Sequence, residues 1–128
     1  MERSELEEIG KRIITSAIKV HQTLGPGLLE SAYQKCLAYE LQLLGVKVEC
    51  EVPVPIRYGA ILIETGYRLD MLIEGSVIVE NKTVETILPI HEAQLLTYLR
   101  LKDIRLGYLL NWHVHLMKDG IRRFVNNL

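Results

Sequence analysis

Three charged residues lie in segments that are otherwise apolar, and their spacing allows metal-assisted chemistry. Glu80 and Lys82 are two residues apart in VIVENKTVE, residues 77–85, so in a strand their side chains share one face. Asp70 lies in the preceding apolar segment, GYRLDMLIEG. Burying charge in a sheet is costly unless it is paired or bound to an ion, so these residues are candidates for a functional site.

The turn between the two segments decides whether the two carboxylates meet. If residues 74–76 form a three-residue loop, Ile73 pairs with Val77 and Asp70 lies directly opposite Glu80. Like charges at such positions are destabilising, and a bound cation reverses that effect. Hard cations such as Mg²⁺ take one or two carboxylates together with water and phosphate oxygens. The spacing therefore predicts a metal site that depends on this loop.

Lys82 is expected on the same face as Glu80, where its ammonium group can hold a water or neutralise charge that develops on a phosphate. Two alternatives remain at this level. The residues Asp70, Glu80 and Lys82 can form a salt-bridged patch on a solvated face, and a two-residue loop would send Asp70 to the other face.

Glu30 begins the apolar stripe of a predicted helix over residues 28–44. It is in line with Tyr33, Leu37, Leu41 and Leu44, at steps of three and four residues, so we expect it to point toward the sheet. The alternative is an acidic residue in the first helical turn that interacts favourably with the helix dipole.

Gln94 and Tyr98 are four residues apart on a predicted helix over residues 90–102, preceded by Pro89, which suits a first helical turn. Both can bond to a water, a phosphate or a site carboxylate. Two satisfied polar groups at the edge of the core would give the same pattern.

The remaining elements follow from periodicity and turn signals. A first helix is expected from a capping box at Ser4 and Glu7 to Leu24, and a strand over 46–56 should bury one face at a sheet edge, since it contains Pro53 and Pro55. Further strands are expected over 67–73 (or from Ala60), 77–84 and 105–112, and a hairpin at Asp119-Gly120 should join 115–117 to 121–124. The order α-α-β-β-β-α-β predicts an α/β or α+β fold.

Composition sets the broad class. The chain has 128 residues, which predicts a single domain over 1–128, and its net charge of −1 argues against a nucleic-acid coat protein but not against an enzyme. No apolar run is long enough to span a membrane, and the N-terminus is too charged for a secretory signal, so we expect a cytoplasmic protein. Cys36 and Cys50 are expected to be small buried residues.

Three basic residues near the C-terminus, Lys118, Arg122 and Arg123, form a small cluster that can contact phosphate. Ordinary surface charges on a terminal hairpin would give the same pattern.

Several blocks of the sequence together resemble a known family. GLLESAY, residues 27–33, matches the motif of the GxxExxY proteins, and LGPGLLESAY, EVPVPI, GYRLDMLIEG, VIVENKTVE, HEAQLLTYL and KDGIRRFV match in order over nearly the whole chain. That family is similar to the PD-(D/E)XK nuclease superfamily. The resemblance implies a restriction-endonuclease-like αβββαβ core, a mixed central sheet flanked by helices, with one extra N-terminal helix.

The resemblance also implies roles for particular residues. It makes Asp70 the motif aspartate, Glu80 the second acid, Lys82 the motif lysine and Glu30 an additional acid from the preceding helix, and it matches Gln94 and Tyr98 to polar positions. Two positions depart from the pattern. Leu69 stands where the superfamily label has proline, and Asn81 is polar where an apolar residue is common, so Asn81 needs a hydrogen-bond partner on the opposite face.

Two hypotheses follow. In the first, the protein is a metal-dependent nuclease that cleaves phosphodiesters of DNA or RNA. Asp70, Glu80 and the main-chain carbonyl of Asn81, helped by Glu30, bind Mg²⁺ or Mn²⁺, while Lys82 positions the attacking water. In the second, the same fold is a non-catalytic module that binds nucleic acid or a protein partner, or forms a homodimer.

Overall fold

The computed structural model describes residues 1–64 and 66–128, which form three α-helices, seven strands and one short 3₁₀ helix. The helices are α1 (Arg3–Leu24), α2 (Glu30–Leu43) and α3 (Pro89–Lys102), and the 3₁₀ helix is η1 (Met117–Gly120). The strands are β1 (Val48–Pro53), β2 (Ile56–Tyr58), β3 (Ile61–Ile63), β4 (Arg68–Ile73), β5 (Val77–Lys82), β6 (Leu106–Asn111) and β7 (Ile121–Val125).

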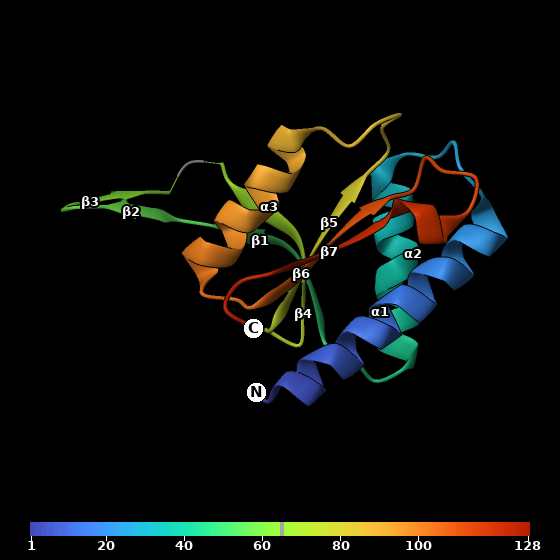
Figure 1. Ribbon diagram of the computed structural model, residues 1–128, viewed down its shortest axis with the longest axis horizontal. Coiled ribbons are helices and arrows are strands. Elements are labelled where there is room, and N and C mark those ends of the chain that lie inside the picture. Colours follow the sequence, from blue (N-terminus) through green and yellow to red (C-terminus); the bar gives the residue numbers. More distant parts are fainter. Residues whose placement is uncertain (65) are drawn as a thin grey trace.

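Five of the strands form a mixed sheet in the order β1-β4-β5-β6-β7, in which only the β5–β6 pair is parallel. Helices α1 and α2 cover one face of this sheet and α3 covers the other (Figure 1). The apolar core is divided accordingly. One cluster lies between the sheet and α1–α2 and includes Leu37 and Val79, and a second under α3 includes Ile78 and Leu95.

The sequence of elements confirms the predicted fold class. Helix α2, strands β1, β4 and β5, helix α3 and strand β6 make up the αβββαβ core, and α1 is the extra N-terminal helix. β1 is an edge strand, as its prolines predicted. In the described part of the chain, no helix is both long and apolar enough to cross a membrane.

The strand predicted over residues 46–56 is wrong as one continuous element with a single buried face. Glu51 adopts a left-handed backbone conformation with φ of 55°, and the burial pattern reverses there. Val48 packs on the side of α1 and α2, whereas Val52 and Val54 pack in the cluster under α3. The strict alternation that the sequence suggested therefore fails at one residue.

Beyond this reversal the chain leaves the sheet. β2 and β3 form a separate two-stranded hairpin that projects away from the main sheet (Figure 1). The register places Ile56 opposite Ile63 and Tyr58 opposite Ile61, so these four side chains share one face, while Arg57 and Leu62 share the other. The strand predicted over 67–73 is present as β4 from Arg68, and the alternative start at Ala60 is wrong for the same reason.

Three smaller predictions are also corrected. The Asp119-Gly120 hairpin is absent from the described residues, because residues 117–120 form η1 and β7 pairs with β6 instead. Helix α1 begins earlier than predicted, and its capping box is formed by Glu2 and Glu5. Cys50 is exposed and Cys36 half-buried, since Cys50 lies on the edge strand of the sheet, where it lines an open groove.

Candidate active site

The register of the β4–β5 hairpin brings two carboxyl groups together. Ile73 pairs with Val77, which confirms the three-residue loop and places Asp70 level with Glu80. Each carboxylate bonds to the main chain of the other strand. The Asp70 N–H donates to Glu80 Oε1 at 3.2 Å, and the Asn81 N–H donates to Asp70 Oδ2 at 2.8 Å. The two side chains thus tie the strands together beyond Met71 and Val79, the last pair of the β4–β5 ladder.

Burial makes this pair of acids electrostatically unusual. Glu80 is only 5% exposed, and its pKa is raised to about 9, first because burial disfavours the charged form and second because of the negative charge of Asp70. Burial also raises the pKa of Asp70. Two ionised carboxylates at this position need a compensating positive charge, which a proton or a cation can supply.

Lys82 and Tyr98 complete the surroundings of the pair. The positive charge of Lys82 lowers the pKa of both Asp70 and Glu80, although this effect is smaller than that of burial. Tyr98 is buried on α3, and its pKa is raised first by burial and then by the negative charges of Glu80 and Asp70. Strands β4 and β5 and helix α3 therefore bring four of the predicted residues into one place.

Glu30 lies on the opposite side of the strand end from α3, at the start of α2. Its side chain is exposed, and its Oε2 accepts bonds from the Thr83 N–H at 3.2 Å and the Thr83 hydroxyl at 3.5 Å. Glu30 also lines a groove with Asp70. The carboxylate thus reaches the residue that follows Lys82 at the end of β5, although it lies in the first turn of α2 and is exposed rather than buried against the sheet.

This groove, of about 580 Å³, runs between α2 and the edge strand β1. It contains one acid that the sequence reasoning missed, Glu51. The pairs on either side of it, Cys50 with Met71 and Val52 with Leu69, bring it level with Asp70, and its charge raises the pKa of Asp70 by repulsion. The Glu51 carboxylate accepts a bond from Gln34 Nε2 at 3.0 Å. In a regular strand the side chains of Cys50 and Glu51 would point to opposite faces of the sheet. Both line the groove here, and the left-handed backbone at Glu51, which the sequence does not reveal, accompanies this departure.

The remaining predicted residues are not brought to the carboxylate pair by any contact in the described residues. Gln94 is exposed, one turn before Tyr98 on α3. Arg122 pairs with Glu92 at 2.5 Å and Arg123 with Glu7 at 2.7 Å, so these guanidinium groups tie β7 to α3 and to α1. Lys118 is exposed in η1.

The tyrosine of the GLLESAY segment has a structural role. Tyr33 is fully buried, and its ring stacks on Trp112 with centroids 4.8 Å apart. Its hydroxyl donates to the Gly25 carbonyl at 2.5 Å and accepts the Leu28 N–H at 3.2 Å. The segment between α1 and α2 is held by these bonds, and this fixes where α2 and Glu30 begin.

The donors at the site fit a hard divalent cation that keeps part of its water shell. Asp70 and Glu80 supply adjacent carboxylate oxygens, which are the ligands that Mg²⁺ and Mn²⁺ prefer. In residues 1–64 and 66–128, no three His, Cys, Asp or Glu side chains lie close enough together to enclose a metal ion. The site therefore suits a cation held by two carboxylates, water and substrate oxygens, and not a closed protein cage.

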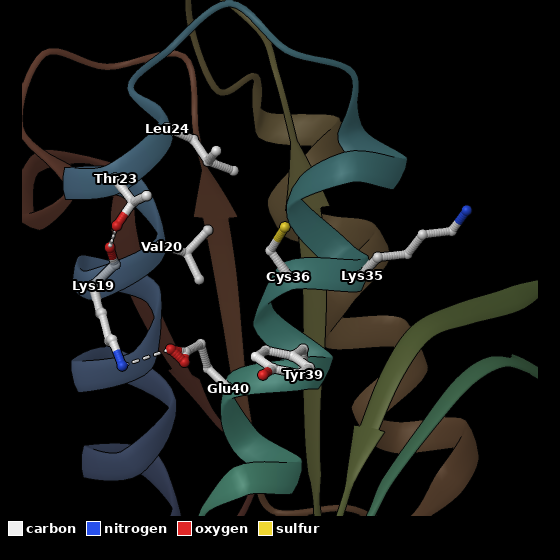
Figure 2. A pocket seen from close by; sticks show the side chains of 8 residues that line it. All are labelled: Lys19, Val20, Thr23, Leu24, Lys35, Cys36, Tyr39 and Glu40. Atoms are coloured by element: carbon white, nitrogen blue, oxygen red, sulfur yellow. Dashed lines mark hydrogen bonds and ion pairs between the residues drawn. The ribbon is translucent and has the colours of Figure 1, made fainter.

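A second hollow, of about 260 Å³, lies between α1 and α2 and has different chemistry (Figure 2). Val20, Leu24 and Cys36 turn toward it, and Lys19 pairs with Glu40 across the two helices at 2.8 Å. Its single carboxylate is thus already paired with a lysine, so the carboxylate pair on β4 and β5 is the better candidate for catalysis.

A mixed sheet between helices, with two carboxylates and a lysine on its central hairpin, is the architecture of restriction-endonuclease-like proteins. The model of one family, the PD-(D/E)XK nuclease superfamily, matches residues 7–124. This chain belongs to the PD-(D/E)XK nuclease superfamily. No curated protein and no solved structure matches it. The resemblance to the GxxExxY proteins within this superfamily stays a prediction.

Proposed function

We propose that the protein is a metal-dependent nuclease that hydrolyses phosphodiester bonds in DNA or RNA. The observation that carries this proposal is the adjacency of Asp70 and Glu80, two carboxylates in a setting where burial opposes their charge. The superfamily match supports the same activity.

In this proposal Asp70, Glu80 and the main-chain carbonyl of Asn81 hold Mg²⁺ or Mn²⁺, and Glu30 supports the site through Thr83. When bound there, the cation would polarise the phosphate and lower the pKa of a bound water. Lys82 orients the attacking water and neutralises charge on the phosphate. Tyr98 closes the site from α3 and donates its hydroxyl proton to a carboxylate or a phosphate oxygen, and Gln94 contacts substrate one helical turn away.

The proposal is tested by incubating the protein with single-stranded, double-stranded and branched DNA and RNA in the presence of Mg²⁺ or Mn²⁺. We expect cleavage of at least one substrate that stops when the metal is chelated. Absence of both cleavage and metal affinity in the folded protein would contradict the proposal.

The Lys82→Ala variant separates catalysis from metal binding. Removing a group that orients water or stabilises charge in the transition state typically costs about 10²–10³-fold in rate. We expect a loss of this size, with Mn²⁺ affinity retained, because both carboxylates remain. Lys35→Ala is the matched control, since Lys35 lines the groove without belonging to the carboxylate pair. Equal losses in the two variants would contradict the role of Lys82.

A second function, binding a protein partner or a second copy of the chain, is favoured by the β2–β3 hairpin. One face of this projecting hairpin carries only Ile56, Tyr58, Ile61 and Ile63. An exposed and uncharged apolar face on a two-stranded hairpin is typical of a surface that another protein covers.

A further inference from the structure

Asn81 lies between Glu80 and Lys82, and its side chain has no role in the proposed chemistry. That side chain is nevertheless fully buried. Its Oδ1 accepts the indole N–H of Trp112 at 2.9 Å. Its Nδ2 lies 3.4 Å from Gln34 Oε1 and 3.4 Å from Met71 Sδ. An amide supplies both an acceptor and donors, so it satisfies partners on two sides that no apolar side chain could satisfy.

These contacts join the segment after Glu80 to α2, to β4 and to Trp112, the residue that follows β6. Trp112 also donates its main-chain N–H to the Lys82 carbonyl at 2.9 Å, so one residue holds Asn81 by its side chain and Lys82 by its backbone. Gln34 continues the chain of bonds from α2 to Glu51 on β1. The result is a polar network through Glu51, Gln34, Asn81 and Trp112, here called the Asn81 network, which is buried at Asn81 and Trp112 and exposed at Glu51.

The Asn81 network bears directly on the carboxylate pair, because the main-chain N–H of Asn81 is a donor to Asp70. When the side chain is held by Trp112 and Gln34, the peptide groups on both sides of Asn81 have a fixed orientation. We propose that Asn81 is a positioning residue, whose buried amide sets the orientation of Asp70 and of its own main-chain carbonyl for cation binding. This inference rests on the proposed metal site.

The physical basis is that one partner of Asn81, the indole N–H of Trp112, cannot turn to solvent. Trp112 is fully buried and stacked on Tyr33, so its indole N–H has no water to replace Asn81. Leaving such a buried donor without an acceptor costs roughly 1–3 kcal/mol. A leucine at position 81 has the same branching and number of heavy atoms but creates that deficit and adds some volume, and the segment is then expected to shift to relieve both.

The chain contains its own reporter for this arrangement. Trp112 is the single tryptophan of the sequence, and its indole bonds to the network through Asn81. Binding of Mn²⁺ to the carboxylates should therefore change tryptophan fluorescence, and Mn²⁺ affinity can be measured independently by electron paramagnetic resonance of the free ion. Neither measurement requires a substrate or any activity.

The test compares wild type with Asn81→Leu and, as a control of similar destabilisation, Val20→Ala, which opens space in the core under α1. We expect Asn81→Leu to weaken Mn²⁺ binding by about 10–100-fold, as loss of outer partners of metal ligands does, and to abolish the fluorescence response. Val20→Ala should bind as wild type does.

Unchanged Mn²⁺ affinity in folded Asn81→Leu would overturn the positioning role and leave the nuclease proposal standing. Absence of Mn²⁺ binding in wild type would overturn both. If Asn81→Leu does not fold, Trp112→Phe decides the question, because it keeps an aromatic ring against Tyr33 and removes the indole donor, while Val20→Ala controls for the core volume that is lost with it. Weaker Mn²⁺ binding in that variant supports the inference, and wild-type affinity overturns it.

Discussion

Glu80 shows how burial changes the behaviour of one carboxyl group. Its pKa of about 9 keeps it protonated at neutral pH when no cation is bound, because burial and the charge of Asp70 both disfavour ionisation. In the unfolded chain the same group ionises near its ordinary value of 4.5. Folding of the metal-free protein therefore takes up a proton between these two pH values.

This linkage predicts a pH dependence of stability. Because the folded state binds more protons than the unfolded state, the contribution of Glu80 to the free energy of unfolding is full below pH 4.5. It is lost as pH rises toward 9, by at most about 1.4 kcal/mol per pH unit. Glu80→Gln removes this titration. Chemical denaturation of metal-free protein from acidic to alkaline pH should show wild type losing stability relative to the variant as pH rises. Parallel curves would contradict the pKa shift.

Much of the residue-level arrangement could be predicted from the sequence. The period of two in strands, together with the length of the loop before Val77, was enough to place Asp70 beside Glu80. Glu51 could not be placed in this way, since a left-handed backbone at a non-glycine residue leaves no mark in a pattern of apolar and polar types. The partners of Asn81 were also hidden, because they come from residues 34 and 112, far away in the chain.

At the scale of elements, the β2–β3 hairpin stands apart because its apolar side chains are largely exposed. Tyr58 is 76% exposed and Ile61 56% exposed, and in the described residues the two strands pair only with each other. An isolated hairpin of this length is at best marginally stable in water, so a surface that covers its apolar face would stabilise it. The absence of charge on that face favours another protein surface over a phosphate backbone.

The hairpin can be tested with two substitutions on its opposite faces. We expect wild type to form a dimer and Ile61→Lys to shift it to a monomer, because a charge in the apolar face opposes its burial. Leu62→Lys adds the same charge on the other face and should leave the dimer intact. Light scattering after size-exclusion chromatography measures both. A monomeric wild type, or dimers in both variants, would contradict self-association through this face.

The hairpin and the break before it also show where sequence reasoning stopped at this scale. Residues 46–56 alternate apolar and polar types almost perfectly, which predicts one strand. The alternation hides a change of partner, because Val48 and Val52 bury themselves in different clusters. A strand that buries first one face and then the other can show the same alternation of apolar and polar residues as a strand that buries a single face. Only tertiary contacts distinguish the two cases.

At the scale of the whole molecule, the site depends on how closely helix α3 packs on the central sheet. Gly107 on β6 lies directly under α3, and a Cβ added there would lie 3.2 Å from side-chain carbons of Leu95 and Leu99. The same helix carries Tyr98 to the carboxylates. The absence of a side chain at position 107 thus allows α3 to lie close enough for that contact.

Gly107→Val tests this close approach. Overpacking of a tight core typically costs about 1–3 kcal/mol, and here the displaced helix should also carry Tyr98 away from Glu80. We expect lower stability by denaturation and slower cleavage, with no direct change to any site residue. Ala93→Val, exposed on α3, is the control for the added volume and should have little effect. Wild-type stability in Gly107→Val would show that α3 can move without cost.

The way in which β4 and β5 are joined at the site has a consequence for the protein with a cation bound. Asp70 and Glu80 each accept a main-chain N–H from the opposite strand through one oxygen, so the carboxylates that would hold a cation also fasten the hairpin. An ion bound through the other oxygen of either carboxylate would draw negative charge away from the oxygens that accept these amide protons. Binding of the ion would then alter the bonds that close this end of the hairpin, and amide hydrogen exchange at Asp70 and Asn81 would record the change.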